Sequence, residues 1–245
     1  SRAMSMRSSG NRNRDCSSGV CLSIDNVDTD AGTLDIYMTN QAGCSVNETE
    51  GIVFYSDMNE GDCDGVGDWF DGYVGGFQFQ LTNIEITDAA GGSAEAAGFL
   101  LQTGGTDVPS GLSKVLGYSL TGGTIQPGVD ALLTTVLFSE YFSEYTCFGD
   151  DTEFNACSDA IGGSIAVNWG DCSCLAGLDE CGVCGGDGIP ESDCDCLGNI
   201  LDECGICGGD NSSCADCAGE PNGDNEIDNC GTCDNDPDND CDMDC

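Results

Sequence analysis

Short stretches in which apolar and polar side chains alternate recur along residues 20–169. This alternation is the pattern of β-strands that bury one face, because successive side chains of a strand point to opposite sides. We predict strands at residues 21–27, 33–40, 75–82, 98–103, 114–120, 131–138 and 163–169. The side chains that the pattern places on buried faces include Leu34, Ile36, Met38, Phe77, Phe79 and Leu81.

The alternation changes phase at residues 82–83, because the next apolar positions are Ile84 and Ile86. Such a shift predicts a β-bulge. Residues 41–72 are rich in Gly, Asp, Asn and Glu and are predicted as a long excursion, whereas residues 89–97 have room for a short helical turn. Many short strands with Gly-rich turns favour an all-β fold, which we expect to be a jelly-roll-like antiparallel β-sandwich.

The last third of the chain has a different pattern, a tandem repeat with few apolar side chains. The run Asp-Glu-Cys-Gly-Val-Cys-Gly-Gly-Asp at residues 179–187 returns with one change at residues 202–210, and a looser copy occupies residues 228–236. Units this poor in apolar residues need cross-links in place of a core. We therefore expect three parts: a basic arm at residues 1–15, the sandwich at 16–171, and a disulfide-stapled, loop-rich repeat tail at 172–245.

Cysteine supplies 20 of the 245 residues, and 14 of the 20 lie from Cys172 onward. Such a density indicates either disulfides in an oxidising compartment or thiolate metal sites, since Cys-x-x-Cys is also the spacing of zinc ligands. We favour disulfides, because the chain has no histidine and nearby carboxylates raise the pKa of a thiol. In the sandwich we predict the pairs Cys16–Cys21, Cys44–Cys63 and Cys147–Cys157, whereas connectivity in the tail stays open. The tail cysteines expected to be oxidised are Cys172, Cys174, Cys181, Cys184, Cys194, Cys196, Cys204, Cys207, Cys214, Cys217, Cys230, Cys233, Cys241 and Cys245.

The formal net charge is −40, from 45 acidic and 5 basic residues. Such a surface repels nucleic acid and anionic membranes, which excludes both as partners. No apolar run approaches the roughly 20 residues that a membrane helix needs, so we expect no membrane span. No signal peptide opens the sequence, so for an exported protein we expect a mature or partial chain.

The few basic residues are concentrated at the start of the chain. Lys114 is one of the five, and the other four are the arm residues Arg2, Arg7, Arg12 and Arg14. An arm that is polar and rich in serine is expected to be disordered alone. Because the rest of the chain is acidic, we expect the arm to bind an acidic surface of its own chain or of a neighbour. Binding to a neighbour would be head-to-tail, which builds open filaments unless a rotation closes the ring.

Acidic clusters give two candidate calcium sites, since Ca²⁺ prefers hard oxygen ligands. The candidate ligands are Asp57, Asn59, Asp62, Asp64 and Asp68 in the excursion, and Asp224, Glu226, Asp228, Asp234 and Asp236 in the tail. The spacing in the excursion does not fit an EF-hand loop, because Gly61 stands where a ligand should be. The alternative at both places is a solvated acidic loop.

Two Asn-x-Ser/Thr sequons, at Asn47 and Asn211, permit N-glycosylation, which belongs to the secretory route. Together with the expected disulfides they favour an extracellular or cell-surface location.

The sandwich region resembles cohesin domains over residues 20–171. The resemblance is carried by the runs at residues 24–27, 32–38, 74–79, 115–119 and 132–138. It implies a jelly-roll sandwich without catalytic activity, of a kind that binds dockerin modules or assembles surface scaffolds. The cysteines and the two long insertions depart from that family, so the fold is carried over and no binding residue is.

The tail resembles a second type of module, the Cys-Gly-Val-Cys-Gly-Gly-Asp repeat of extracellular matrix proteins. This repeat occurs in the cysteine-rich module of thrombospondin-repeat metalloproteases and in slime-mould matrix proteins, and residues 204–214 match it closely. The resemblance implies an extracellular disulfide module. Residues 222–228 and 234–244 are also similar, more loosely, to the calcium-binding type-3 repeats of thrombospondin.

An enzyme is not expected, because the chain lacks a histidine base, a phosphate-binding loop and a Gly-x-Ser-x-Gly elbow. The preferred hypothesis is a secreted structural protein that polymerises with itself into an extracellular filament, sheath or appendage. The first alternative is a cell-surface module that binds a dockerin-like peptide or a glycan, with Trp69, Phe70 and Tyr73 as candidate contacts. The second is a metal-storage polythiol, which would have free thiols.

Overall fold

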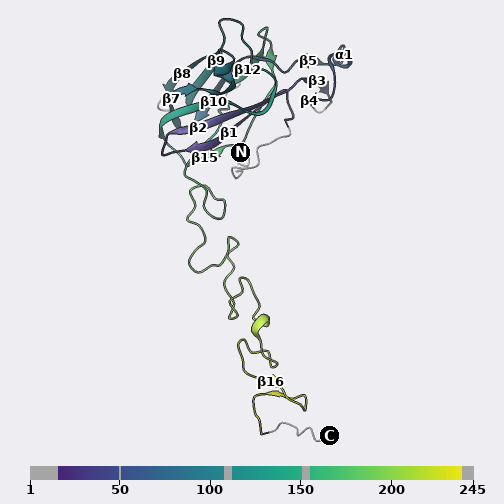
Figure 1. Cartoon of the computed structure of the whole chain (residues 1–245), viewed down its shortest axis with the longest axis vertical. Coiled ribbons are helices and arrows are strands. Elements are labelled where there is room, and N and C mark those ends of the chain that lie inside the picture. Colours follow the sequence, from purple (N-terminus) through teal and green to yellow (C-terminus); the bar gives the residue numbers. More distant parts are fainter. Residues whose placement is uncertain (1–15, 50, 108–111, 151–154, 239–245) are drawn as a thin grey trace. The chain divides into compact units, whose positions relative to one another are not determined.

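The structure is a computed structural model that describes residues 16–49, 51–107, 112–150 and 155–238. The chain divides into two compact units, Ser1–Gly177 and Leu178–Cys245 (Figure 1). We placed this division after residue 171. It falls later because β15 (Ser173–Cys174) pairs with β11 (Tyr145–Thr146), and because Cys172 is disulfide-bonded to Cys147.

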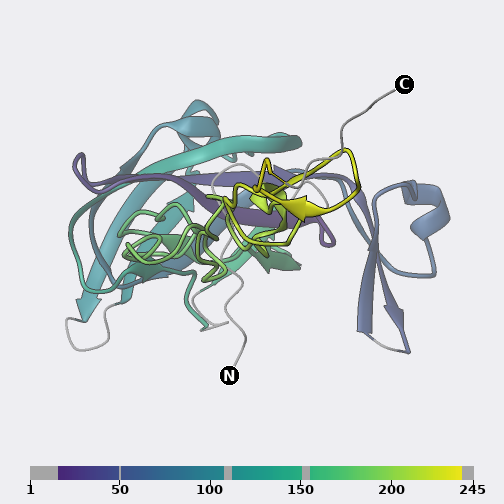
Figure 2. The same cartoon turned by 90° about the horizontal axis from the view of Figure 1, so that it is seen from below.

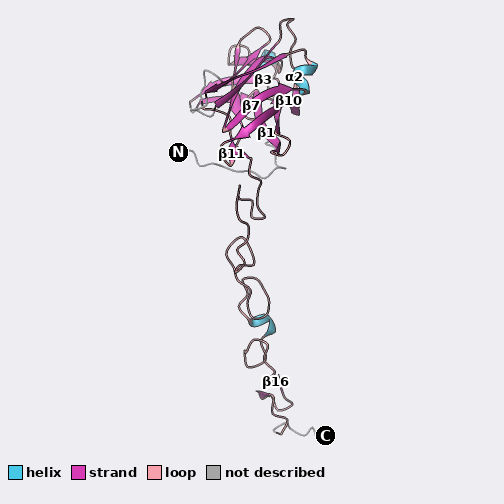
Figure 3. Cartoon of the chain, turned by 90° about the vertical axis from the view of Figure 1, so that its left-hand side faces the viewer, coloured by secondary structure: helices cyan, strands magenta, loops and turns pink. Residues whose placement is uncertain are grey.

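The first unit is a β-sandwich of two five-stranded sheets, which confirms the predicted all-β class (Figures 1 and 3). The first sheet has the order β14 (Val167–Trp169), β1 (Val20–Asp28), β2 (Thr33–Asn40), β10 (Gly128–Tyr141), β7 (Ile84–Ala90). The second has the order β13 (Ser164–Ile165), β12 (Ala156–Asp159), β6 (Val74–Thr82), β9 (Leu112–Tyr118), β8 (Leu100–Asp107). Strand pairs within both sheets are antiparallel except β1 with β14, which is parallel.

The alternating apolar positions fill the space between the two sheets. Leu34, Ile36 and Met38 on β2 are fully buried, and so are Phe79 and Leu81 on β6. An aromatic cluster continues this core, because the Phe148 ring lies edge-on to Phe79 with centroids 5.8 Å apart and meets Trp169 at 5.3 Å. The inward faces predicted from the sequence are therefore confirmed, and this apolar layer holds the first unit together.

The phase shift at residues 82–83 marks a change of sheet, and the predicted bulge is wrong there. β6 ends in one sheet and β7 begins in the other, with Asn83 between them at φ 60°. Asparagine tolerates this left-handed conformation, and its side chain donates to the Tyr145 carbonyl at 3.0 Å. The predicted strand at residues 163–169 divides in the same way, into β13 of the second sheet and β14 of the first.

The excursion contains a third, smaller sheet, which the sequence did not predict. Its order is β4 (Gly51–Tyr55), β3 (Gly43–Glu48), β5 (Asp68–Phe70), with the single-turn helix α1 (Glu60–Cys63) before β5. We call residues 43–70 the insert sheet; Figure 2 shows it projecting from one end of the sandwich. The other short helix, α2 (Gly92–Ala96), lies inside the helical turn predicted at residues 89–97.

The second unit has almost no regular structure in its described residues. It contains the 3₁₀ turn η1 (Ser212–Cys214) and the two-residue strands β16 (Glu226–Ile227) and β17 (Cys233–Asp234). Cys184 is its one buried hydrophobic residue among those described, whereas Leu197 is 87% exposed. A unit of this kind lacks the apolar burial that stabilises an ordinary domain.

Candidate interaction surfaces

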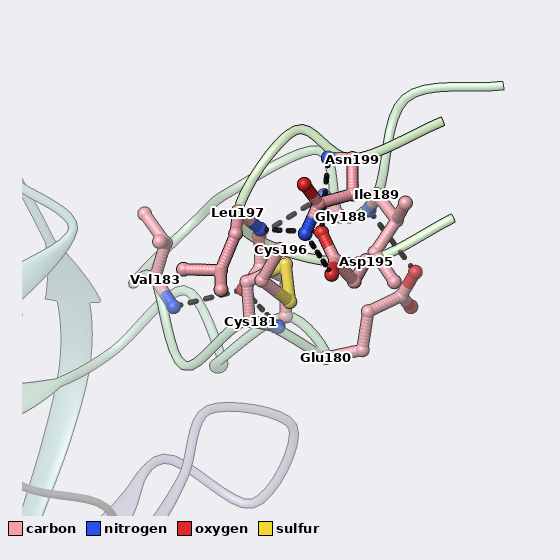
Figure 4. Close-up of a disulfide and its surroundings, with 10 residues drawn as sticks. Glu180, Cys181, Val183, Gly188, Ile189, Asp195, Cys196, Leu197 and Asn199 are labelled. Carbon is pink, nitrogen blue, oxygen red and sulfur yellow. Dashed lines mark hydrogen bonds between the residues drawn. A yellow bond between two sulfur atoms is a disulfide. The ribbon is translucent and has the colours of Figure 1, made fainter. Parts of the chain in front are cut away.

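Interlocking disulfides hold the tail together in place of a core. Cys181 pairs with Cys196, Cys194 with Cys207, Cys204 with Cys214, and Cys217 with Cys233. The first three loops overlap, since each begins before the previous one has closed, and Figure 4 shows the first of these bonds. Cys174, Cys184 and Cys230 are also disulfide-bonded. So many oxidised cysteines indicate an oxidising compartment.

A single carboxylate organises each repeat of the tail. Oδ1 of an aspartate accepts the backbone N–H groups two and four residues further on, which we call the aspartate turn. It occurs five times in the described part of the tail, at Asp179, Asp195, Asp202, Asp216 and Asp228, and once in the sandwich, at Asp159. The residue three positions after each aspartate is a glycine with φ between 75° and 88°, a conformation that glycine adopts at little cost.

Three of the five turns use the second carboxylate oxygen in the same way. Oδ2 of Asp179, Asp202 and Asp216 accepts the N–H nine residues on, at 3.0, 2.9 and 3.1 Å. The oxygen also lies against the glycine seven residues on: a Cβ at Gly209 would stand 2.1 Å from Oδ2 of Asp202. Each full repeat therefore requires an aspartate, two glycines and a free N–H at fixed positions.

The turn at Asp228 departs from this pattern at both later positions. Asn235 stands where the other repeats have the second glycine, and Pro237 stands where they have the N–H donor. Proline carries no N–H. As a result, Oδ2 of Asp228 is buried without a hydrogen-bond partner in the described part of the chain. The copy at residues 228–236, which matches the repeat least well in sequence, thus also lacks one of its hydrogen bonds.

The hydrogen bonds of the aspartate turns favour the ionised carboxylate. The N–H of Val183 is the main cause that lowers the pKa of Asp179 below its ordinary value of 3.8, and the N–H of Ile206 does the same for the pKa of Asp202. At Asp195 the Asn199 side chain is the main cause of the lowered pKa (Figure 4). The tail therefore keeps these carboxylates charged at neutral pH.

The disulfides of the sandwich agree with two of the three predicted pairs. Cys16 pairs with Cys21 and Cys44 with Cys63. Cys147 instead pairs with Cys172, because the pairing of β11 with β15 brings their chain segments together. Cys157 is a free thiol, which corrects its predicted disulfide: it lies on β12 opposite Phe77, inside the core. Burial raises the pKa of the Cys157 thiol to about 12, so the thiol is inert.

Aromatic rings hold the insert sheet against the sandwich, and one disulfide ties its own segments together. The Phe54 ring of β4 lies over Gly43, where a Cβ would stand 2.4 Å from the ring, and Phe70 of β5 is buried in the core. The Cys44–Cys63 bond ties β3 to α1. These contacts hold the sheet although its own apolar content is small.

The surface of the insert sheet combines exposed apolar side chains with negative charge. Ile52 is 63% exposed and Val53 37% exposed, both on β4. The exposed acids of this sheet are Glu48, Asp57, Glu60, Asp62, Asp64 and Asp68, and residues 43–70 contain no lysine or arginine. A hydrogen bond from Tyr55 to Glu48 raises the pKa of the tyrosine above its ordinary value of 10.0. This surface therefore suits a basic, partly apolar partner.

The described geometry does not assemble the predicted calcium ligands. Asn59 instead caps α1, accepting the Asp62 N–H at 3.1 Å and donating to the Asp62 carboxylate. In the tail, Asp228 and Asp234 accept backbone N–H groups. Within the described ranges no three His, Cys, Asp or Glu side chains are arranged to hold a metal ion. Calcium binding at both clusters stays a prediction from the sequence.

The structure separates the three aromatic residues that we predicted as exposed contacts. Phe70 belongs to the core, and Trp69 is half-buried, whereas Tyr73 is exposed directly before β6. Two further exposed aromatic residues, Tyr141 and Phe142 at the end of β10, were missed. The sequence carried a signal for them, because two adjacent aromatic residues cannot both point into a sandwich from one strand.

The two sequons differ in their surroundings. Asn47 is exposed on β3. Asn211 is half-buried at φ 67°, and its Oδ1 accepts the Glu203 N–H at 2.8 Å. Glycosylation at either stays a prediction. The arm residues Arg2, Arg7, Arg12 and Arg14, and Cys241 and Cys245, lie outside the described residues.

Among the helices of the described residues, none is both long enough and apolar enough to cross a membrane.

Comparison with known proteins gives a likeness to solved structures alone. No protein-family model matches the chain, and no curated protein matches it. Solved structures that match include the sixth cohesin from Acetivibrio cellulolyticus scaffoldin B in complex with a dockerin, at 17% identity and a TM-score of 0.37, covering 64% of this chain and 99% of that chain. A type I cohesin–dockerin complex from Clostridium thermocellum matches at 12% identity and a TM-score of 0.36, covering 63% of this chain and 95% of that chain. The seventh ScaB type I cohesin from Pseudobacteroides cellulosolvens matches at 13% identity and a TM-score of 0.34, covering 63% of this chain and 90% of that chain. At these TM-scores we base no function on the similarity.

Proposed function

We propose that this chain is a secreted, non-enzymatic structural subunit that assembles head-to-tail through its basic N-terminal arm. The observation that carries the proposal is the separation of charge. Lys114 is the one base in residues 16–245, whereas the first fourteen residues contain four arginines. Charges of opposite sign on separate parts of one chain favour contact between copies.

The way the chain is stabilised supports a role outside the cell. Disulfides close loops in both units, from Cys16–Cys21 to Cys217–Cys233. Cross-links of this kind persist under oxidising conditions and are rare in the cytosol. An assembly of such subunits would resist unfolding without depending on a large apolar interface.

The arm itself gives the test of this proposal. We compare the full chain with a variant in which Arg2, Arg7, Arg12 and Arg14 are replaced by Gln, using sedimentation velocity at several concentrations and ionic strengths. The wild-type chain is expected to form assemblies at low salt that dissociate as salt is added, because exposed charges are screened over about 10 Å at 0.1 M salt. The variant is expected to stay monomeric. Equal sedimentation of the two chains under every condition would contradict the proposal.

A second candidate function is a cell-surface module that binds a dockerin-like peptide or a glycan. The observation that favours it is the exposed aromatic pair Tyr141 and Phe142, 47% and 56% exposed, since aromatic faces supply contact area at small entropic cost. Glycan-array and pull-down binding by the full chain decides it. Binding that is lost in Tyr141→Ala and Phe142→Ala supports this function, and no binding by the wild-type chain excludes it.

A further inference from the structure

We propose that the outer edge of β4 is the acceptor for residues 2–7 of the N-terminal arm of a second copy, which adds there as an extended strand. The inference rests on the proposed head-to-tail assembly and names the surface that receives the arm. Backbone groups on an exposed sheet edge pair with an added strand, and neighbouring side chains select which strand is added.

Among the sheet edges in the described residues, β4 is the one best placed to accept a strand. β7 and β8 border the two large sheets on the same side, where Thr103 Oγ1 donates to the Thr87 carbonyl at 3.5 Å, so they cover one another. At the opposite side the edge strands are β13 of one sheet and β14 of the other. A single residue joins these two strands, so the chain passes directly from one edge to the other. β5 is an edge of three residues, whereas β4 has five and pairs with β3 alone.

The side chains at this edge give β4 the chemistry of a docking site. Ile52 and Val53 are adjacent, so one lies on each face of the strand, and both are exposed. Long exposed apolar edges of this kind are normally protected by lysine or proline, and residues 51–55 contain neither. The edge therefore offers apolar contact on both faces as well as unpaired backbone groups.

The sequence of the arm is complementary to this edge. In residues 2–7, Arg-Ala-Met-Ser-Met-Arg, an extended backbone would put Met4 and Met6 on one face. Methionine adapts to irregular apolar surfaces, so this face suits Ile52. Arg2 and Arg7 at the two ends would meet the acidic field of Glu48 and the other insert-sheet carboxylates. A segment of six residues is also long enough to span the five residues of β4.

The first experiment uses the full chain with one substitution at the edge. Ile52→Lys places a positive charge against the incoming arm while removing a side chain that is already exposed, so the fold is retained. We expect self-association, measured by sedimentation velocity, to weaken about tenfold or more. The matched control is Ile161→Lys, because Ile161 is 93% exposed in the turn between β12 and β13 and adds the same charge elsewhere. The control should associate like the wild type.

The second experiment locates the contact directly. A photo-crosslinking amino acid replaces Met4 in a heavy-isotope chain, which is mixed with unlabelled chain, and cross-linked peptides are identified by mass spectrometry. The proposal expects mixed-isotope cross-links to residues 51–55. Cross-links within one copy, or to another surface with Ile52→Lys assembling normally, overturn the acceptor site while arm-dependent assembly stands. A wild-type chain that stays monomeric overturns the proposed function and this inference together.

Discussion

At the scale of single residues, hydrogen bonds from backbone N–H groups to aspartate carboxylates determine the local conformation of the tail. The sequence shows the cysteine repeat at residues 179–187 and 202–210, which an alignment on cysteine finds. It hides the turn at Asp216, because the cysteine there comes one residue after the aspartate instead of two. The carboxylate, its two glycines and the distant N–H define the unit, and these become visible once the bonds are known.

Acid should release the aspartate turns at a pH below the ordinary carboxyl pKa. Because the folded-state pKa values of Asp179 and Asp202 are lowered from 3.8, the stabilisation is fully present above that value and is lost as pH falls through the lowered values. The amide NMR signals of Val183 and Ile206 should therefore titrate with midpoints below 3.8. In Asp202→Asn the Ile206 signal should no longer follow this titration, while Val183 still does. Midpoints at or above 3.8 would show that the bonds are absent.

Completing the turn at Asp228 should stabilise it. The double substitution Asn235→Gly and Pro237→Ala supplies the missing glycine and the missing N–H to Oδ2 of Asp228. The new amide at position 237 should exchange its hydrogen about tenfold more slowly than an open amide, as a satisfied buried carboxylate is worth on the order of 1 kcal/mol or more. Asn235→Gly alone is the control, since it opens the space and adds no donor. Equal hydrogen-exchange rates of the amides near residue 228 in both variants would show that the N–H nine residues on does not stabilise the turn.

At the scale of elements, the period-two pattern predicted most strands of the two large sheets, but it gave β7 only as a continuation beyond a bulge and missed β12 and the insert sheet. The reason is local: residues 41–72 are dominated by Gly, Asp, Asn and Glu, which outweigh the short apolar run at β4. What forms the sheet is non-local, namely Phe54 over Gly43 and the bond between Cys44 and Cys63. The change of sheet at Asn83 was visible as a phase shift, but a shift does not say which sheet the next strand joins.

Removing the Cys44–Cys63 bond should loosen the insert sheet. Replacing both cysteines by Ala opens a loop with a separation of 19 residues, and loop entropy gives a loss of about 3 kcal/mol. The same change at Cys16 and Cys21, with a separation of 5, should cost about 2 kcal/mol. Chemical denaturation followed by fluorescence measures both. If the two variants are as stable as the wild type, the chain-entropy account of the insert sheet fails.

At the scale of the whole molecule, two units of one chain are stabilised by different physics. The first unit buries an apolar layer that runs from Val20 to Leu175, whereas Cys184 is the one buried hydrophobic residue among those described in the second unit. The sequence pattern predicted this difference, because the alternation of apolar and polar residues stops where the cysteine repeats begin. It could not give the connectivity of the bonds or the role of Cys157, which depend on how the strands pair.

A reductant should therefore act on the two units unequally. Once the disulfides of the tail are reduced, little remains to restrict residues 178–238, and their amides should exchange at rates close to those of an unfolded chain. The strands β2 and β6 should keep their protection, since their burial does not depend on sulfur. Hydrogen–deuterium exchange by mass spectrometry with and without reductant makes the comparison. Simultaneous loss of protection in both units would contradict it.

The central claim is that oxidised sulfur takes the place of an apolar core in the tail of an extracellular chain. Its most direct test is to alkylate the denatured, unreduced protein from its native source and map every cysteine by mass spectrometry. The account predicts the linked pairs Cys181–Cys196, Cys194–Cys207, Cys204–Cys214 and Cys217–Cys233, with Cys157 alkylated. Alkylation of those tail cysteines, or their recovery with bound zinc, would contradict it.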